Sequence, residues 1–168
     1  KVGGAVFPSG SVAYLVIARF IDDVLILPAR ESFTGASNTA VGNNSMIFNT
    51  TGNNNTALGR NSLYTNTTGY NNTSVGTGSL YLNTTGYNNT AVGYYSLNEK
   101  TGGIYNTAVG YESLIANSTG NYNTALGTSS LASNTTGNSN TAVGRWSMRN
   151  STTGINNSAL GNNSLYSN

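Results

Sequence analysis

The sequence predicts an all-β protein in which a parallel β-solenoid of about eight 17-residue coils follows a short N-terminal segment. The pentapeptide N-T-A-[V/L]-G recurs with a constant period and without insertion or deletion, with Ser in place of Ala or Thr in two copies. Within each unit, fixed positions alternate with freely varied ones, as expected of stacked similar coils. Two fixed Gly per unit, among Asn, Ser and Thr, disfavour helix. The copies begin at Asn38, Asn55, Asn72, Asn89, Asn106, Asn123, Asn140 and Asn157.

Counted from that Asn, the unit reads N-T-A-[V/L]-G-x-x-S-[L/M]-x-x-N-T-T-G-x-x, and its positions are numbered 1 to 17. Gly at position 5 and Ser at position 8 occur in all eight copies, and Gly at position 15 occurs in all seven copies that reach it. We predict that these fixed positions form the structural framework of each coil. In the first unit they are Asn38, Ala40, Val41, Gly42, Ser45, Met46 and Gly52.

Each unit predicts two short extended segments, T-A-[V/L] and S-[L/M]-x-x, ended by Gly-containing turns. Alternation along the first segment places Thr39 and Val41 on one side and Ala40 on the other. The residue at position 3 is always small, which indicates close approach of a neighbour. Because a unit offers only about three apolar residues for burial, we expect an oligomer with the Ala side packed against neighbouring chains. The Thr side then faces inward.

Residues 1–37 differ in kind from residues 38–168. They contain no Asn, both prolines and half of the twelve charged residues. The apolar runs Val12–Ile21 and Val24–Leu27 flank Asp22 and Asp23, a pattern typical of a β-hairpin, although a helix over 12–27 stays open. The charges of Arg19 and the two Asp residues argue against a membrane span. We predict two domains, with 1–37 as a β segment for docking or trimer base.

The composition argues against catalysis. The chain has no His and no Cys, and only 7% of its residues are charged. The repeated Ser therefore has no His to activate it, and Asp22 and Asp23 are better explained by a turn. The repeats contain no Asp for calcium binding. Seven dispersed basic residues, among them the scattered Arg60, Arg145 and Arg149, favour no nucleic-acid site. We expect no enzyme, cofactor or metal.

Asn residues at positions 1 and 12 predict ladders in which each amide bonds to the coils above and below. The position 12 ladder breaks at Lys100 and at Ser151, whereas the ladder that begins at Asn38 is unbroken.

Aromatic residues at variable positions are the candidate ligand face. Several lie one period apart, and such stripes either stabilise a sheet by cross-strand pairing or stack on sugar rings of a host glycan. The pairing explanation is the plainer one. The candidates are Tyr64, Tyr70, Tyr81, Tyr87, Tyr94, Tyr95, Tyr111 and Trp146.

The repeat N-T-A-V-G-x-x-S-L-x-x-N-T-T-G resembles the head repeats of trimeric autotransporter adhesins and related repeats of phage tail fibres and other virion appendages. The resemblance covers 38–168 and rests on Thr39, Ala40, Val41, Gly42 and their counterparts. It implies a left-handed parallel β-roll in each of three chains around a common axis. The unit is longer than the usual head unit, and no heptad stalk or membrane-anchor barrel is present in this sequence.

These observations predict a non-enzymatic fibre, spike or capsid-decoration protein of a virion, located on the virion surface or outside the cell. Its expected partners are two further copies of itself, other virion or surface proteins through residues 1–37, and a host-surface glycan. A bacterial adhesin head is the alternative. Ice binding through the Thr ladder that starts at Thr39 is a remote one, because that ladder is expected to face inward.

Overall fold

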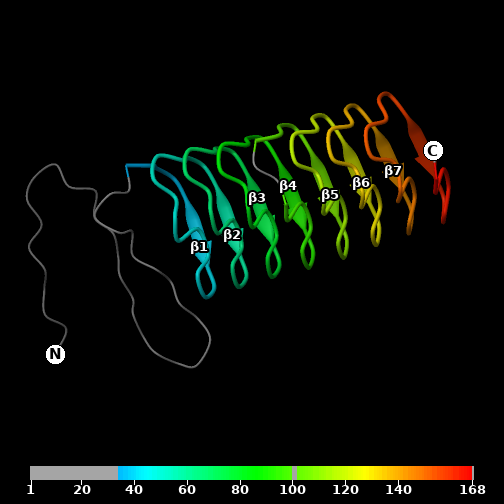
Figure 1. Ribbon diagram of the computed structural model, residues 1–168. Coiled ribbons are helices and arrows are strands. Elements are labelled where there is room, and N and C mark those ends of the chain that lie inside the picture. Colours follow the sequence, from blue (N-terminus) through cyan, green and yellow to red (C-terminus); the bar gives the residue numbers. More distant parts are fainter. Residues whose placement is uncertain (1–33, 100–101, 168) are drawn as a thin grey trace, which may run out of the picture.

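The computed structural model describes residues 34–99 and 102–167, and this part of the chain is a parallel β-solenoid without helices. Each coil contributes one three-residue strand, and the eight strands lie side by side in chain order in one sheet (Figure 1). The strands are β1 (Thr39–Val41), β2 (Thr56–Leu58), β3 (Thr73–Val75), β4 (Thr90–Val92), β5 (Thr107–Val109), β6 (Thr124–Leu126), β7 (Thr141–Val143) and β8 (Ser158–Leu160).

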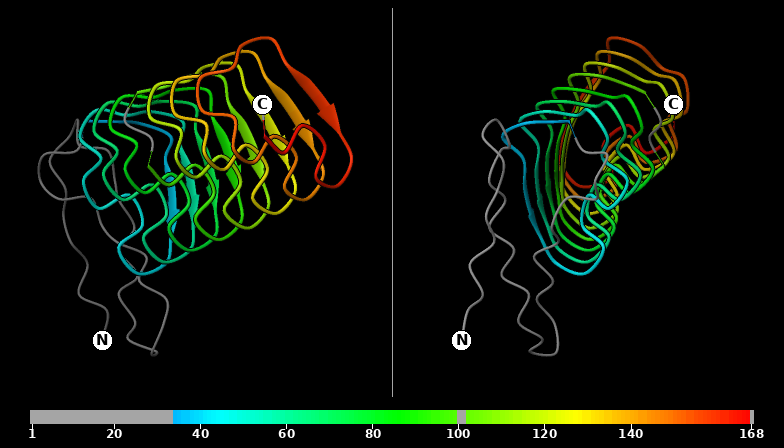
Figure 2. Two further views of the ribbon diagram at one scale, coloured as in Figure 1. Left: turned by 45° about the vertical axis from the view of Figure 1, so that its right-hand side comes forward. Right: turned by 90° about the vertical axis from the view of Figure 1, so that its left-hand side faces the viewer.

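Every neighbouring pair of strands is parallel and in the same register, so that equivalent positions of successive units are partners throughout. Viewed along the rod, the successive coils superimpose as similar closed outlines (Figure 2). The predicted fold class and the length of the coil are therefore confirmed. At about 4.8 Å per coil, the eight strands span about 34 Å.

The stack begins before Asn38. The backbone N–H of Thr34 donates to the Thr50 carbonyl (2.8 Å), and the N–H of Asn54 donates to the Ala36 carbonyl (3.0 Å). Residues 34–37 therefore occupy positions 14 to 17 of a preceding coil. The predicted hairpin, the alternative helix over 12–27 and the charged residues Asp22 and Asp23 lie outside the described residues.

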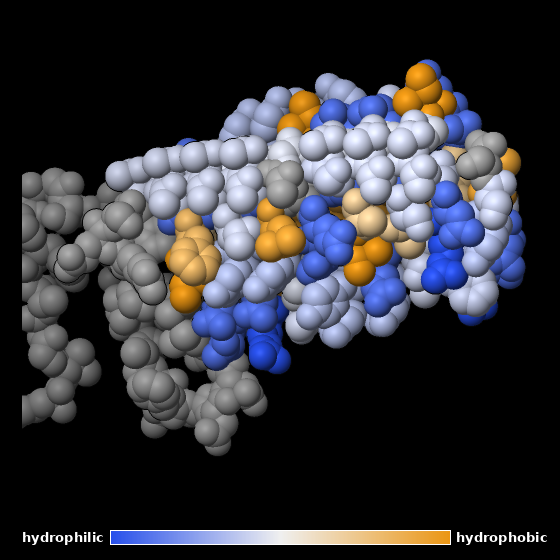
Figure 3. All heavy atoms as spheres, in the orientation of Figure 1, coloured by the Kyte–Doolittle hydropathy of each residue, from blue (hydrophilic) through white to orange (hydrophobic). Residues whose placement is uncertain are grey.

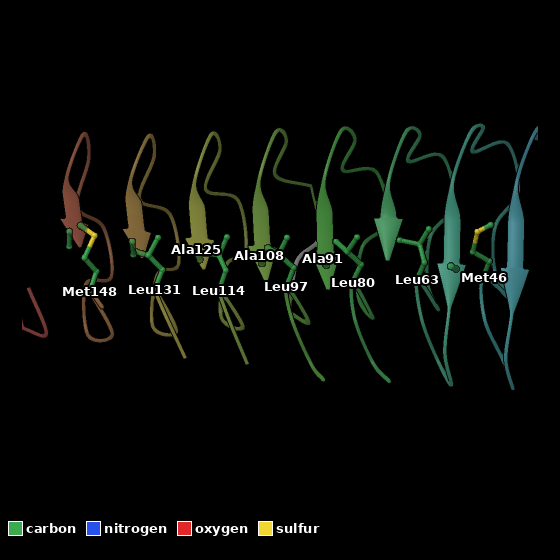
Figure 4. Packing of buried hydrophobic residues seen from close by; sticks show 13 residues of the cluster. Met46, Leu63, Leu80, Ala91, Leu97, Ala108, Leu114, Ala125, Leu131 and Met148 are labelled. Carbon is green, nitrogen blue, oxygen red and sulfur yellow. The ribbon is translucent and has the colours of Figure 1, made fainter. Parts of the chain in front are cut away.

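The strand side chains alternate as predicted, but the inner and outer sides are the reverse of the expectation. Ala57, Ala91 and Ala108 are fully buried within the single chain. They belong to one cluster with the Leu or Met of position 9, which reaches them from the opposite side of the coil (Figure 4). Only a small side chain, Ala or in one coil Ser74, lies buried between the two sides, and this explains the small residue at position 3. The Ala side is therefore not an interface between chains, and Thr and Val or Leu face outward.

The second predicted strand does not form. After the strand, positions 6 to 11 make a series of turns in which the N–H and the hydroxyl of Ser45 both donate to the Gly42 carbonyl. Met46, at position 9, has a φ of 50°, in the left-handed region, and its counterparts in the other coils share that conformation. A left-handed residue cannot continue an extended strand. It turns the Leu or Met side chain into the coil, where burial offsets the conformational cost.

Two further positions per coil, 7 and 17, are also left-handed, with φ between 50° and 59° where the residue is not Gly. Asn tolerates this conformation better than most residues, and it holds each of the two positions in at least three coils, as at Asn44 and Asn54. Between these bends the backbone still bonds from coil to coil; for example, the Asn61 N–H donates to the Asn43 carbonyl at 2.9 Å. The coil is therefore hydrogen-bonded to its neighbours outside the strands as well as within them.

The position 1 asparagines form the predicted ladder inside the coil. The Oδ1 of Asn89 accepts the backbone N–H of Asn106 at 3.0 Å, and the Oδ1 of Asn106 accepts that of Asn123 at 2.9 Å. The Nδ2 of Asn106 donates to the Gly120 carbonyl at 2.9 Å. The contact between coils recurs without interruption from Asn38 to Asn157. This ladder satisfies polar groups in an interior that has few apolar side chains.

The position 12 ladder breaks where the sequence predicts. The Nδ2 of Asn66 donates to the Oδ1 of Asn49, and that of Asn134 to the Oδ1 of Asn117 at 3.1 Å. Where Ser151 replaces the next Asn, the Oδ1 of Asn134 has no hydrogen-bond partner although it is buried. Among the described residues, the Oδ1 of Asn83, which precedes Lys100 in the ladder, is the other buried orphan. Each break therefore costs one unsatisfied acceptor.

Restoring the ladder is expected to stabilise the protein. In Ser151→Asn, the new Nδ2 reaches the orphaned Oδ1 of Asn134, because Asn at this position makes that bond in other coils, as between Asn83 and Asn66. We expect the free energy of unfolding in urea to rise by about 1 kcal/mol. Ser133→Asn, on an outer turn of the preceding coil, is the control and should leave it nearly unchanged. Equal effects of the two substitutions would refute the ladder explanation.

Candidate functional site

The eight aromatic residues singled out from the sequence do not form one face. They fall into separate groups on the turns of the coil, at positions 6 and 7, at position 10, and at position 16. Within the tyrosine groups, rings of successive coils contact one another along the rod. The candidate surface is therefore a set of short aromatic rows rather than a single aromatic plane.

The longest group, here named the tyrosine ladder, consists of Tyr70, Tyr87, Tyr105 and Tyr122. Tyr70 stacks on Tyr87 with ring centroids 4.6 Å apart, and Tyr105 stacks on Tyr122 at 5.2 Å. Between the two pairs, Tyr87 meets Tyr105 edge to face at 5.9 Å. Tyr105 and Tyr122 are not among the residues predicted from the sequence, because they stand at position 17 rather than 16. Their adjacency to position 16 on the same turn was the signal that could have found them.

A second group lies at positions 6 and 7, on the turn that follows the strand. Tyr94 stacks on Tyr111 at 5.4 Å and meets Tyr95 edge to face at 4.4 Å. The pKa of Tyr111 is raised by its hydrogen bond to Glu112 and by the charge of that carboxylate, and desolvation is the main cause of the raised pKa of Tyr94. Both phenols are therefore neutral at physiological pH.

The third group consists of Phe48, Tyr64 and Tyr81. Tyr64 and Tyr81 stack at 4.9 Å, and Phe48 closes the row edge to face at 5.0 Å from Tyr64. All three predicted pairs one period apart are therefore in ring contact: Tyr64 with Tyr81, Tyr70 with Tyr87, and Tyr94 with Tyr111.

Trp146 stands apart from the tyrosines of positions 6 and 7. The coil that carries Thr128 and Ser129 at these positions separates it from Tyr111. Its contacts are the guanidinium of Arg145, 3.5 Å from the ring centroid, and that of Arg149, 5.5 Å from it. Tyr166 meets the Trp ring edge to face at 6.5 Å. The two arginines, which look scattered in the sequence, are therefore brought together on one ring.

The ring geometry determines what the tyrosines can do chemically. Stacking on a sugar needs an open ring face, and the planes of the stacked pairs lie within 8° of parallel, so each ring covers a face of its neighbour. The ends of the rows and the ring edges stay accessible. At the end of the tyrosine ladder, Tyr122 is 57% exposed. The contacts themselves stabilise the stack by pairing aromatic rings between coils.

The outward side of the sheet is a second regular surface, here named the sheet face. It consists of the position 2 and position 4 side chains of β1 to β8, which form one row of Thr, ending in Ser158, beside one row of Val and Leu. Leu58 and Val109 are each 37% exposed, and Leu160 is 80% exposed. Elsewhere on the rod, Figure 3 shows regular rows of side chains with isolated apolar patches rather than one apolar band.

Within residues 34–99 and 102–167, no group of three His, Cys, Asp or Glu residues is placed to hold a metal ion. In the same part of the chain, no helix is long and apolar enough to cross a membrane. No family model, curated protein or solved structure matches the chain.

Proposed function

We propose that the protein is a non-enzymatic structural rod, displayed as a fibre, spike or decoration on the surface of a virion. The observation that carries this proposal is the in-register stack, in which equivalent positions pair at every one of the strand contacts. The interior repeats the same Asn, Ser, Ala and Leu contacts in successive coils, whereas the outer turns vary. Such a construction supplies length and stiffness along one axis and leaves the turns free for variation.

Immunogold labelling with antibodies against the repeat tests the location. Purified virions and intact cells from the source organism are compared in the electron microscope. We expect label on virion appendages. Label confined to a bacterial surface would replace this proposal with the alternative of an adhesin head, and label on neither particle would refute surface display altogether.

We further propose that the rods assemble as homotrimers through the sheet face. The Ala side is closed inside each chain, so this face is the continuous surface that carries apolar side chains over all eight coils. The strands that form it contain no charged residue. Burial of the Val and Leu row between chains would add apolar contact that a single coil, with one Ala and one Leu or Met in its core, does not contain.

Sedimentation equilibrium tests the assembly. We expect a mass three times that of the single chain. Replacing Leu58 and Val109 by Lys on the sheet face should yield folded monomers, because charges would be buried unpaired in the interface. The control is Val41→Thr, which keeps the β-branched shape without a charge. A wild-type protein that sediments as a stable monomer would refute the trimer.

Ice binding is the second candidate function, since the Thr row faces outward rather than inward. From Thr39 to Thr141 the hydroxyls and methyls repeat at about 4.8 Å on a sheet, and Ser158 continues the hydroxyl row alone. The two uses of the sheet face exclude each other. If the monomer is the native state, thermal hysteresis that is lost in Thr107→Tyr would support ice binding. Its absence in the wild type would eliminate this candidate.

A further inference from the structure

We propose that Arg145, Trp146, Arg149 and Tyr166 form a binding site for a carboxylate-bearing polysaccharide. This site, here named the arginine–tryptophan site, goes beyond the structural role of the rod, and its ligand binding can be measured whatever particle carries the protein. It lies on the turns after β7 and β8, outside the sheet face. The groups that form it come from two successive coils, since Tyr166 stands one period after Arg149.

The guanidinium groups of Arg145 and Arg149 both lie against the ring of Trp146. Their carbons lie 3.5 Å and 5.5 Å from the same ring centroid. The Nη1 of Arg149 donates to the hydroxyl of Tyr166 at 3.0 Å, which fixes the orientation of that side chain. Contact with the Trp ring likewise restrains Arg145. Two like charges held against one ring repel each other, and an anion bound to both would relieve that repulsion.

No acidic side chain of the described residues neutralises this pair. From residue 113 to the end of the chain, the two arginines are the only charged side chains. The described carboxylates, Glu99 and Glu112, belong to coils on the far side of the one that carries Ser129. The arginines are therefore separated from those carboxylates along the rod. A guanidinium fork matches the planar geometry of a carboxylate, which is the ligand group that we propose.

The ring of Trp146 occupies a position at which the coil does not need an aromatic residue. Position 7 is left-handed, with a φ of 58° at Trp146, and Asn44, Asn61 and Asn163 hold the same position in other coils. Tyr95 shares this conformation, but its ring contacts Tyr94, whereas the ring of Trp146 contacts two guanidinium groups. Here the ring positions two cations.

A polysaccharide fits this site better than a nucleic acid does. Binding of a nucleic-acid strand needs a positive groove that follows successive phosphates. The neighbouring coil edges offer instead neutral donors and acceptors, such as Asn150, whose Nδ2 lies 3.4 Å from the Ser167 hydroxyl. An acidic polysaccharide carries its charges apart, with hydroxyls between them, and needs only a local cationic site among neutral polar groups.

The test is the binding of immobilised polygalacturonate to the full chain at low ionic strength, measured by biolayer interferometry. We expect the Arg145→Gln/Arg149→Gln double variant to lose affinity by about tenfold or more. Trp146→Asn restores the residue that other coils use at position 7, so it should fold normally and still weaken binding severalfold. Circular dichroism and thermal unfolding establish that each variant is folded.

Arg60→Gln is the matched control, because Arg60 occupies position 6 like Arg145 but has Asn61 rather than Trp beside it. It should leave the affinity unchanged. Equal losses for Arg60→Gln and the double variant would show non-specific attraction and overturn the site. So would absence of binding by the wild type, or tighter binding of dextran sulfate or single-stranded DNA than of polygalacturonate.

Discussion

Asn106→Asp is expected to lower the free energy of unfolding by about 3–5 kcal/mol, although it changes a single NH₂ group to an oxygen. Asn106 is fully buried, and its Nδ2 donates to the carbonyls of Gly120 (2.9 Å) and Ile104 (3.0 Å). A carboxylate keeps the bond that Oδ1 accepts from Asn123 but places a negative charge against two carbonyl oxygens. The ladder therefore requires the hydrogen-bond donor of the amide group, because Asp has nearly the same shape as Asn but lacks that donor.

The destabilisation should depend on pH. Burial raises the pKa of the new carboxyl in the folded state above its value in the unfolded chain. Between those two values the folded state binds more protons than the unfolded state, so stability falls as the pH rises. Urea unfolding at several pH values should therefore show partial recovery in acid. Asn43→Asp, on an exposed turn, is the control, and an equal loss there would contradict the ladder explanation.

Gly110→Ala is expected to cost about 2–5 kcal/mol, from two separable causes. Gly110 has a φ of 135°, a conformation that L residues rarely adopt. A Cβ there would also lie 2.6 Å from the carbonyl oxygen of Gly127 in the next coil. Because that atom belongs to the backbone of a hydrogen-bonded coil, it cannot move away without disturbing the stack.

Gly161→Ala separates the two causes. Gly161 has a similar φ of 117°, but a Cβ built there meets nothing within 4 Å. Its cost should therefore be the conformational part alone, about 1–3 kcal/mol. Gly102→Ala, at a position that holds Thr in other units, should be neutral or slightly stabilising. In thermal unfolding, the loss of stability should be largest for Gly110→Ala, smaller for Gly161→Ala and absent for Gly102→Ala. An equal loss at Gly161 and Gly110 would refute the close approach between coils.

Most of the fold was predictable because a perfect period leaves only one way to stack the coils in register. The Asn ladders and the break at Ser151 also followed, since each depends on the identity of one repeated residue. The second strand was predicted wrongly. Met46 and its counterparts adopt the left-handed conformation although Leu and Met are not residues typical of it, so the S-[L/M] segment gives no sign of the bend. Only the Gly at position 5 indicates an unusual backbone conformation from its residue type.

The inner and outer sides of the strand were also interchanged. Alternation correctly placed Ala40 on the opposite side of the strand from Thr39 and Val41. It does not determine which of the two sides faces the interior of the coil. The small side chain at position 3 indicated a close contact but did not identify the group that makes it. The contact is with position 9 of the same chain, and that position reaches the strand only because it bends inward. The shortage of apolar residues in each unit favoured a contact with another chain instead.

The candidate surface was less predictable than the fold. The ring pairs one period apart followed from the spacing, whereas the continuation of the tyrosine ladder through Tyr105 required knowing that positions 16 and 17 share a turn. Arg145 and Arg149 looked dispersed because residues that are four apart have no fixed relation on an irregular turn. They meet at Trp146 because of the local conformation of this turn, which the period of the sequence does not predict.

The deletion of one whole unit tests most directly the claim that the protein is a modular rod. Removing 123–139 takes out one complete period, which holds no aromatic or charged side chain, and joins position 17 of one unit to position 1 of the next. Removing 123–138 leaves one residue of that period behind. We expect the first variant to unfold cooperatively in urea as a folded solenoid, shorter by about 4.8 Å. The second should lose stability severely, because every ladder after the junction shifts out of register. Equal stability of the two deletion variants would show that the stack does not depend on the register of its coils.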